Sequence, residues 1–383
     1  MKIKFDIKYL KFILILGLGF LESQCKHEAK VEVEIHPKNE VKYAGGFSIY
    51  SFENFHKLTL HRAYAGDTQS IDYYLIDRQL PLPDSLQNKR IILTPVQQIV
   101  VTNTSHIPML EALQATSTLI GFPNTSYISS PHTQVLIEKG QVHELGNEQD
   151  MNIEILLHIK PELVVGFGVD HPSKMYENIE RMGIPVLMNA DWMEETPLGR
   201  AEWIKFFGVL YGKSKEANLI FDSIERNYNQ LKVLAQKSTD KPKVLSGSLF
   251  QDVWYTAAGE SFLAQMIHDA HAQYLWADTK GNGSLNLSLE SVLAKGQKAD
   301  YWIAPGDFLT QQSFAEVNPM YLKFKALTQG KTYTYAHQKG KNGGILYFES
   351  SPLHPDWVLE DFIRIFHPEL LNESDFHFFK VVE

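Results

Sequence analysis

Two glutamates, Glu154 and Glu290, occupy the same place in a short pattern that occurs once in each half of the chain. Each opens a short helix, which is followed by a tight loop with an acidic residue and then by an apolar strand. A pair of carboxylates can act as acid and base in catalysis, or can bind cationic side chains of a partner. Catalysis requires both carboxylates in one cleft, whereas helix-opening positions in separate lobes place them on an outer surface. The pattern therefore favours partner binding, and we expect no enzyme activity.

The elements around the two glutamates indicate two similar lobes. In the first copy Asn152 precedes the helix and a strand is expected over 163–167; in the second, Ser288 precedes the helix and a strand is expected over 301–304. A glutamate in the first turn is also favoured by the helix dipole, so each could serve only to stabilise its helix. Two lobes imply a cleft between them, and clefts hold ligands.

The composition is that of an ordinary globular protein. The 383 residues suffice for two domains, and 44% hydrophobic with 21% charged residues allow sizeable cores. The net charge of −9 argues against a general nucleic-acid-binding surface. No internal segment has the roughly 18 apolar residues of a membrane span.

The N-terminus has the features of an export signal. Four lysines precede the apolar run 12–21, and Cys25, the only cysteine of the chain, follows it. This arrangement predicts a signal peptide over 1–24 and lipidation of Cys25, although residues 22–24 form a poor lipobox. Plain cleavage or an uncleaved anchor is the alternative. In each case we expect export to the periplasm or cell envelope, anchored to the membrane where Cys25 is lipidated, and no internal disulfide.

The N-terminal part of the chain begins with a tether and continues with strands. Residues 25–40 are charged and lack a core pattern, which is typical of a tether. An N-terminal lobe is expected over 41–195. Its segment 43–75 alternates like antiparallel strands, and a further strand pair is expected at 91–93 and 99–101. Strands and helices then alternate, which predicts a mostly parallel sheet covered by helices.

Residues 196–240 carry helical periodicity with almost no strand signal. They predict a helical connection that contains a rigid spine helix within 214–236. The alternation of strands and helices resumes afterwards, so a C-terminal lobe is expected over 241–383. The expected fold class is α/β, with two Rossmann-like lobes joined by one long rigid helix.

With these elements in place, the chain resembles the cobalamin/iron-siderophore family of substrate-binding proteins that serve ABC importers. The most specific part is the segment 151–165, which is close to the family signature N-x-E-x-(I/L)-x-x-x-K-P-D-L-(V/I). The segments 183–186, 259–261 and 288–293 support it. The resemblance covers roughly residues 90–366 and implies the class III periplasmic-binding-protein fold.

The resemblance implies capture of an iron–siderophore or related metal chelate and its delivery to an ABC permease dimer with its ATPase. Glu154 and Glu290 match the positions at which that family docks onto permease arginines, whose planar guanidinium suits a carboxylate. The alternative is a cobalamin- or haem-binding surface lipoprotein of the same fold, with or without a transporter. The segment 43–75 departs from the family pattern. A monomer is expected, without a nucleic-acid partner or cofactor, and with a ferric siderophore, corrinoid or haem as ligand.

In this fold the ligand lies against loops that leave the carboxyl ends of the strands. The loop Asn103-Thr104-Ser105-His106 follows a strand and is expected to face the cleft, although Thr104 or Ser105 could simply cap the next helix. Aromatic side chains suit flat or bulky chelates because they offer large contact areas at low entropic cost. Core packing is the alternative for each, and it is the expectation for Trp302. The candidate aromatic residues are Phe122, Phe167, Trp192, Trp254, Tyr255 and Phe308.

No protein-held metal is expected, because the 15 histidines show neither HxH nor HExxH spacing. His106 could touch a metal-bearing ligand, but a lone histidine is more often a hydrogen-bonded surface residue. The arginines, Arg200 among them, fall at no position that the sequence assigns to the cleft. That distribution favours a neutral hydroxamate-type or corrinoid ligand over an acidic chelate. The chain also has no GxSxG, P-loop or strand-following GxGxxG motif.

Overall fold

The computed structural model describes residues 37–61, 64, 66, 68–168, 174–341 and 343–383. The predicted signal peptide and Cys25 lie outside the described residues. Contacts within the chain separate Met1–Pro37 from the compact unit Lys38–Glu383, which holds every described helix and strand. Among the described residues, no helix has the length and apolar character needed to cross a membrane.

The first sheet forms from the β-rich segment. Its strands lie in the order β1 (Phe47–Ser51), β2 (His56–Leu60), β3 (Ile71–Asp77) and β4 (Ile91–Thr94). The first two pairings are antiparallel, and β3 pairs with β4 in parallel. The expected pairing of 91–93 with 99–101 is wrong, because β4 completes this sheet whereas β5 (Ile99–Val101) belongs to the next one.

The N-terminal lobe is built on a parallel sheet of β5, β6 (Leu119–Phe122), β7 (His143–Glu144), β10 (Leu163–Phe167) and β11 (Val186–Asn189). Their order is β11-β10-β5-β6-β7, and all neighbours are parallel. Leu163, Val164 and Val165 are fully buried, as expected for a strand covered on both faces. The strand predicted over 163–167 is confirmed. The other elements of this lobe are α2 (His106–Ala112), α3 (Pro131–Glu138), β8 (Gly146–Asn147), β9 (Asp150–Met151), α4 (Ile153–Ile159) and α5 (Lys174–Arg181).

The C-terminal lobe has a second five-stranded sheet, of β12 (Lys243–Ser246), β15 (Gln273–Tyr274), β17 (Tyr301–Ile303), β18 (Thr332–Thr334) and β19 (Lys380–Val381). Their order is β15-β12-β17-β18-β19, and only the last pairing is antiparallel. A small antiparallel sheet of β13 (Ser248–Phe250), β14 (Val253–Ala257) and β16 (Ser284–Leu287) lies in the same lobe. The helices are α9 (Phe262–Asp269), α10 (Leu289–Gly296), α11 (Gln311–Val317), α12 (Lys325–Thr328), α13 (Leu346–Ser350) and α14 (Pro355–Phe366).

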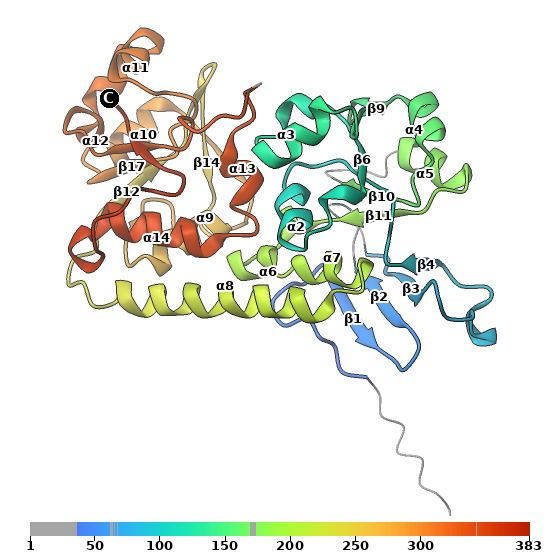
Figure 1. Cartoon of the computed structure of the whole chain (residues 1–383). Helices are drawn as coiled ribbons and strands as arrows, with labels where there is room; N and C mark the ends of the chain where they lie inside the picture. The colour runs from blue at the N-terminus through green and yellow to red at the C-terminus, as the bar shows by residue number, and fades with distance from the viewer. Residues whose placement is uncertain (1–36, 62–63, 65, 67, 169–173, 342) are drawn as a thin grey trace, which may run out of the picture. The chain divides into compact units, whose positions relative to one another are not determined.

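Three helices connect the two sheets: α6 (Pro197–Ala201), α7 (Ile204–Leu210) and α8 (Ser214–Ala235). The 22-residue helix α8 is the spine helix that the sequence predicts, and it packs against both α7 and α14 (Figure 1). Its buried residues Ala217, Phe221, Ile224 and Tyr228 recur every three or four positions and therefore share one face. Gly208 of α7 allows a close approach, because a Cβ there would lie 2.4 Å from that of Ala217. The predicted fold class, two Rossmann-like lobes joined by one long helix, is confirmed.

An aromatic cluster forms the core of the C-terminal lobe. Trp254 and Trp302 are both fully buried and stack with ring centroids 5.4 Å apart. Tyr321 and Phe324 pack on both indoles, with centroid separations between 5.1 and 5.9 Å. Because such rings bury large areas and prefer tilted or offset contacts, this cluster replaces the disulfides that a single cysteine precludes. The core position predicted for Trp302 is confirmed.

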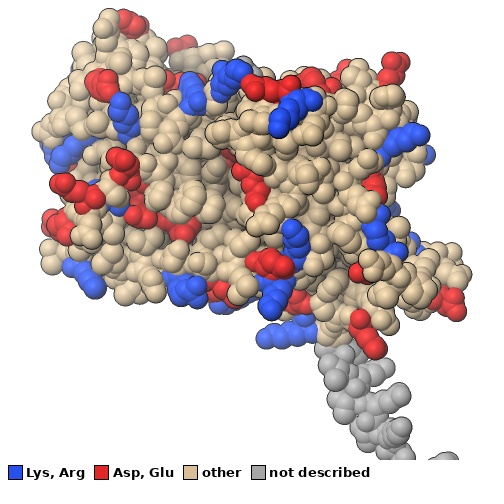
Figure 2. Space-filling view, viewed as in Figure 1, with Lys and Arg blue, Asp and Glu red and all other residues tan. Residues whose placement is uncertain are grey.

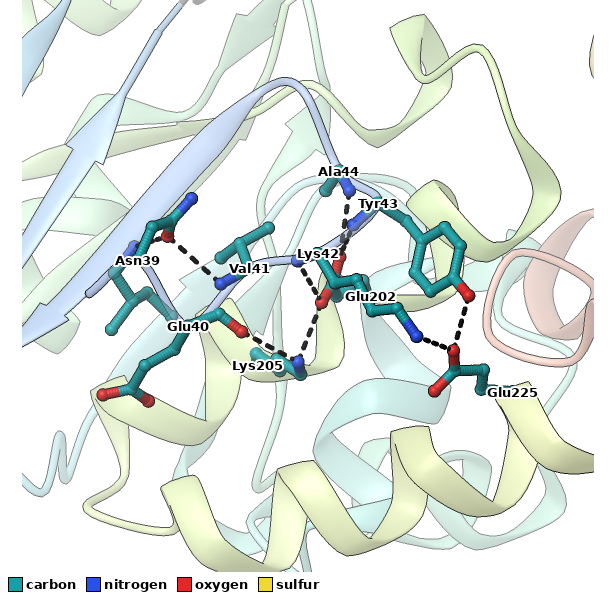
Figure 3. A network of polar contacts seen from close by, with 10 residues as sticks. Asn39, Glu40, Val41, Lys42, Tyr43, Ala44, Glu202, Lys205 and Glu225 are labelled. Carbon is teal, nitrogen blue, oxygen red and sulfur yellow. Dashed lines mark hydrogen bonds and ion pairs between the residues drawn. The ribbon is translucent and has the colours of Figure 1, made fainter.

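Residues 38–46 form an N-terminal strap that is held by two buried glutamates, of which Figure 3 shows Glu202. Glu202 accepts the backbone N–H groups of Lys42, Tyr43 and Ala44 at 2.8, 2.6 and 2.9 Å. Glu194 accepts the next two, those of residues 45 and 46, at 2.7 and 2.9 Å. Two carboxylates thus satisfy five consecutive donors that no strand partner satisfies.

A lysine completes the attachment of the strap. Lys205, itself buried, donates to Glu202 at 2.8 Å and to the carbonyl oxygen of Glu40 at 3.0 Å. Asn39 accepts the backbone N–H groups of Val41 and Ile49, both at 3.1 Å. Asn39 and Glu40 fall in the predicted tether, yet they already belong to the folded unit, which begins at Lys38.

The C-terminal tail is held in a similar way. Asp361 of α14 is fully buried and accepts the backbone N–H groups of His377, Phe378 and Phe379 at 2.9, 2.7 and 3.3 Å. Burial raises the pKa of Asp361 to about 6, against the lowering effect of these N–H groups. No lysine or arginine among the described residues forms an ion pair with it, in contrast to the Lys205–Glu202 pair.

Candidate functional site

The strand orders locate the positions where a ligand is most readily held. In open α/β sheets a ligand binds beyond the carboxyl ends of the strands, at the point where the strand order reverses. In the N-terminal lobe this point lies between β5 and β10, and in the C-terminal lobe between β12 and β17. The loop Asn103-Thr104-Ser105-His106 follows β5, and Phe167 ends β10, so these predicted residues lie at the switch point of their lobe.

Two residues that the sequence did not single out, Glu148 and Tyr176, border this point. The hydroxyls of Thr102 and Tyr176 lie 3.0 Å apart, and the backbone N–H of Phe167 donates to the tyrosine oxygen at 3.3 Å. Thr102 also donates to Glu148 at 3.4 Å. Burial raises the pKa of Glu148, with Thr102 acting in the opposite direction. The half-buried carboxylate of Glu148 therefore adds a hydrogen-bond acceptor beside the switch point of the N-terminal lobe.

His106 is placed in the core rather than on a surface. It is 1% exposed and packs between Phe167 and Phe207, with ring centroids 6.4 and 5.5 Å away. Burial lowers its pKa to about 3, so the ring is neutral, and neither ring nitrogen has a hydrogen-bond partner among the described residues. The expected capping of α2 by Thr104 or Ser105 is wrong, because the N-cap residue Ser105 has a helical backbone conformation and its side chain accepts no N–H of the helix. The residue three positions later is Pro108, which has no N–H to donate.

Phe167 and Trp192 are brought together, whereas Phe122 is not. The rings of Phe167 and Trp192 lie 6.5 Å apart, and the indole N–H of Trp192 donates to the carbonyl of Gly168 at 2.7 Å. Both are half-buried and retain an accessible face. Phe122, at 2% exposure, belongs to the hydrophobic core, so it offers no face to a ligand in this state.

The three predicted residues of the C-terminal lobe also include both buried and accessible side chains. Trp254 is fully buried in the aromatic cluster, whereas its neighbour Tyr255 is 40% exposed and contacts the exposed ring of Phe250. Phe308, in the loop after β17, is half-buried and stacks on Phe314 with centroids 4.1 Å apart. Tyr255 and Phe308 therefore stay accessible, and Trp254 is a core residue.

A cavity of about 430 Å³ lies between residues of the two lobes. Its volume is in the range of small-molecule sites. A hollow of about 530 Å³ beside Tyr73 and Arg90 is larger, but it lies between the first sheet and α5, away from both switch points. The walls of the 430 Å³ cavity, hereafter the interlobe cavity, are formed by Gly66, Trp192, Met193, Glu194, Arg200, Phe262, Asn282 and Gly283.

Polar atoms without partners gather beside this cavity. Ser105, Asn189 and Asp191 are buried, and each has side-chain atoms without a hydrogen bond of normal geometry among the described residues. Burial raises the pKa of Asp191, while Arg200, the Ser105 hydroxyl and the N–H of Trp192 act to lower it. Buried polar atoms are rarely left unpaired, so this concentration marks a place adapted to something other than packing.

A second contact besides the helical connection joins the lobes. Glu349 of α13 is buried and accepts the backbone N–H groups of Ser129 and Ser130, just before α3, at 2.6 and 2.9 Å. Gly344 packs so tightly that a Cβ there would lie 1.9 Å from the carbonyl oxygen of Tyr127. Burial raises the pKa of Glu349 to about 7, opposed by the two N–H groups and reinforced by Glu111. We call this contact the Glu349 latch.

The two pattern glutamates stand on exposed helix starts. Asn152 caps α4 by accepting the N–H of Ile155 at 3.0 Å, and Ser288 caps α10 by accepting that of Ser291 at 3.3 Å. Glu154 and Glu290 follow two residues after each cap and are both exposed. On the face shown in Figure 2, acidic and basic side chains are interspersed rather than gathered into one patch. The two exposed carboxylates are therefore discrete charges on the protein surface.

The described residues contain no group of three histidine, cysteine or acidic side chains arranged to hold a metal ion. Glu154 and Glu290 belong to different lobes and open helices that lead into β10 and β17 respectively. What the geometry offers is therefore a cavity with aromatic, carboxylate and guanidinium groups, suited to binding a small molecule.

Comparison with known proteins decides the family. Residues 99–338, more than half of the chain, match the family described as periplasmic binding protein. The chain belongs to this family. The resemblance drawn from the sequence is thereby confirmed, and the matched residues span both sheets and the spine helix.

Other proteins are similar to this periplasmic binding protein in sequence or in fold. An uncharacterized lipoprotein of Methanocaldococcus jannaschii is 24% identical over 327 residues, covering 82% of this chain and 76% of its own. A periplasmic heme-binding protein of Pseudomonas aeruginosa has a TM-score of 0.58 at 17% identity, covering 75% of this chain and 98% of its own. A protein of an ABC-type Fe3+-hydroxamate transport system from Saccharomonospora viridis has a TM-score of 0.52 at 18% identity, covering 72% and 94%. These structures share the fold.

Proposed function

We propose that this periplasmic binding protein captures an iron–siderophore or related metal chelate and delivers it to an ABC permease dimer with its ATPase. The observation that carries the proposal is the interlobe cavity, which lies between lobes joined by a 22-residue spine helix. The heme-binding and Fe3+-hydroxamate neighbours share this fold and support a chelate as ligand.

The ligand would contact the accessible members of the predicted set. Asn103 and Thr104 follow β5, Phe167 and Trp192 form an aromatic pair, and Tyr255 and Phe308 lie on the C-terminal lobe. Aromatic faces bind flat macrocycles and catecholate or hydroxamate shells without a protein-held metal. Ser105, His106, Phe122 and Trp254 are buried here and offer no face to a ligand in this state.

Glu154 and Glu290 would dock the loaded protein onto arginines of the permease. Both are exposed, each sits two residues after a capping side chain, and the spine helix fixes their separation. A guanidinium pairs with both oxygens of a carboxylate, so two fixed carboxylates suit two arginine sockets. Lipidation of Cys25 would hold the protein at the membrane, which agrees with the lipoprotein description of a relative.

The delivery step is tested by uptake of a labelled ferric chelate in cells that depend on this protein. Glu154→Lys and Glu290→Lys should each reduce uptake about tenfold or more, because a like charge replaces one half of a docking pair. The matched control is Glu373→Lys, the same charge reversal at an exposed glutamate near the C-terminal end of the given sequence. Uptake that stays normal in both variants, with normal protein levels, would refute docking and favour a binding lipoprotein without a transporter.

A further inference from the structure

Arg200 of α6 is an almost buried arginine without a hydrogen bond. Its side chain is 15% exposed, and its buried Nε–H has no acceptor among the described residues. Guanidinium groups in such surroundings normally donate to carboxylates or carbonyls, because unpaired buried donors are costly. The side chain therefore has the chemistry of a group whose partner is a ligand.

Asp191 does not fill that role. The closest oxygen of Asp191 lies 3.9 Å from Nη2 of Arg200, which is beyond hydrogen-bond distance. Both carboxylate oxygens of Asp191 also lack hydrogen bonds of normal geometry. Burial raises the pKa of Asp191, and the nearby charge of Arg200 acts to lower it.

Two neighbours of Arg200 come from the C-terminal lobe, and Glu194 of the N-terminal side lines the same cavity. The guanidinium of Arg200 lies over the ring of Phe262 at 4.8 Å from the centroid. Its charge also acts on Tyr347 of α13, lowering a pKa that burial raises. Arg200 thus reaches from the helical connection to the opposite lobe, at the wall of the interlobe cavity that it shares with Trp192 and Phe262.

We infer that Arg200 is the oxyanion-binding residue of the interlobe cavity, and that the captured chelate carries a carboxylate or similar oxyanion which this guanidinium receives. The inference rests on the proposed function and narrows its ligand class. A planar fork of N–H donors beside two aromatic rings suits a flat or bulky ligand with an acidic group at its edge. It replaces the sequence-based preference for a neutral chelate, which depended on none of the basic residues, Arg200 included, having a position assigned to the cleft.

The test compares an acidic chelate with a partner that lacks the acidic charge, in two pairs of ligands. Ferric protoporphyrin and its dimethyl ester form one pair; an anionic ferric tricatecholate and a neutral ferric trihydroxamate form the other. The protein should bind the acidic member of one pair, and Arg200→Gln should weaken that binding about tenfold or more while leaving the uncharged member unchanged. Arg181→Gln, at an exposed arginine of α5, is the matched control.

Two results would overturn the inference. Equal affinities of the wild-type protein and Arg200→Gln for an acidic chelate would remove Arg200 from the site and leave chelate capture intact. A melting temperature several degrees lower in Arg200→Gln, restored in the double variant Arg200→Gln with Asp191→Asn, would make Arg200 a structural partner of Asp191. The double variant also provides a folded protein in which to measure binding if the single variant does not fold.

If the proposed function is wrong, the binding measurements give a different set of results from those that would overturn the role of Arg200. Binding of none of the four chelates by the wild-type protein would refute capture of these ligands. The oxyanion site is then tested with citrate, whose carboxylates should raise the melting temperature of the wild-type protein and not that of Arg200→Gln. Equal effects of citrate on both proteins would refute the site as well.

Discussion

Each lobe has one helix that begins with the same capping arrangement, but the two lobes place different side chains beside the interlobe cavity. Helices α4 and α10 share a capping side chain and an exposed glutamate two residues later. Beside the interlobe cavity, the N-terminal lobe has unpaired polar groups at Asn189 and Asp191, whereas the C-terminal lobe contributes Phe262. The repeated feature suits one partner that meets both lobes, and the unlike surfaces suit one asymmetric ligand.

The lobes also differ in how their sheets are wound. The first strand, β5, is central in the order β11-β10-β5-β6-β7, whereas β12 is second in the order β15-β12-β17-β18-β19. The lobes are therefore not simple duplicates. They share a mostly parallel five-stranded sheet, the helix start that displays a glutamate and the parallel strand that follows it.

The two chain ends extend the comparison. Glu202 holds the strap through three backbone N–H groups and has Lys205 as a buried cation. Asp361 holds the tail through three backbone N–H groups without such a cation, and burial raises its pKa to about 6. Similar hydrogen bonding with different charge compensation should give different responses to mutation.

The largest effect is expected where a buried ion pair is broken. Glu202→Ala should lower the free energy of unfolding by about 3–5 kcal/mol, because it leaves Lys205 and three N–H groups uncompensated. Asp361→Ala should lower it by about 2–3 kcal/mol, because only N–H groups lose a partner. Denaturation by guanidinium chloride measures both. A larger loss in Asp361→Ala would contradict the role given to Lys205.

The Glu349 latch should make contact between the lobes depend on pH. The pKa of Glu349 is about 7 in the closed latch, against an ordinary value of 4.5. At pH values between 4.5 and 7, closure of the latch is therefore accompanied by uptake of a proton by Glu349. The latch should therefore strengthen as the pH falls from 8 to 5, by up to about 3 kcal/mol. Distances between labels on α3 and α13, in a Cys25→Ser background, report the change.

Glu349→Gln should remove most of this pH dependence, since a glutamine does not titrate. Glu373→Gln, at an exposed glutamate, is its control. Glu111 also faces Glu349 and shares hydrogen bonds with Ser130 and Thr133, so its own variant must be measured alongside. The same pH response in Glu349→Gln as in the wild-type protein would exclude the latch as its source.

Removing the two capping side chains should have equal and moderate effects. Asn152→Ala and Ser288→Ala should each lower stability by about 1 kcal/mol, the usual cost of losing an N-cap. Thermal unfolding of the two variants gives the comparison. A cost confined to one lobe would show that the two helix starts are not equivalent.

Charge reversal at the glutamates should have the smallest effect on the isolated protein. Glu154→Lys and Glu290→Lys should change stability and chelate affinity by less than about 0.5 kcal/mol, because both side chains are exposed. Calorimetric titration and thermal unfolding measure these quantities. Loss of chelate binding in either variant would move that carboxylate into the ligand site.

Local periodicity was enough to predict the architecture. The strand 163–167 and the spine helix were found because burial repeats every residue in a covered strand and every three to four residues in a helix. The pairing of 91–93 with 99–101 failed because strand pairing depends on distant contacts. The capping of α2 failed because the N-cap residue Ser105 has a helical backbone conformation and the residue three positions later, Pro108, has no N–H to donate.

The candidate site was only partly predictable. Periodicity does not distinguish a core face from a cleft rim, so buried Phe122 and Trp254 were grouped with accessible Phe167 and Tyr255. Arg200 was noted without a position, because its neighbours come from segments far apart in the chain. One signal was available: residues 194–205 place five charged side chains in an otherwise apolar helical stretch.

The most direct test of chelate capture is a titration of the intrinsic tryptophan fluorescence with cobalamin, haem, a ferric hydroxamate and a ferric catecholate. Trp192 lines the interlobe cavity, so a ligand bound there should quench part of the emission. The account predicts saturable quenching by at least one of the four at sub-micromolar concentration. No saturable change with any of them, confirmed by calorimetry, would contradict the assignment of this protein as a receptor for these chelates.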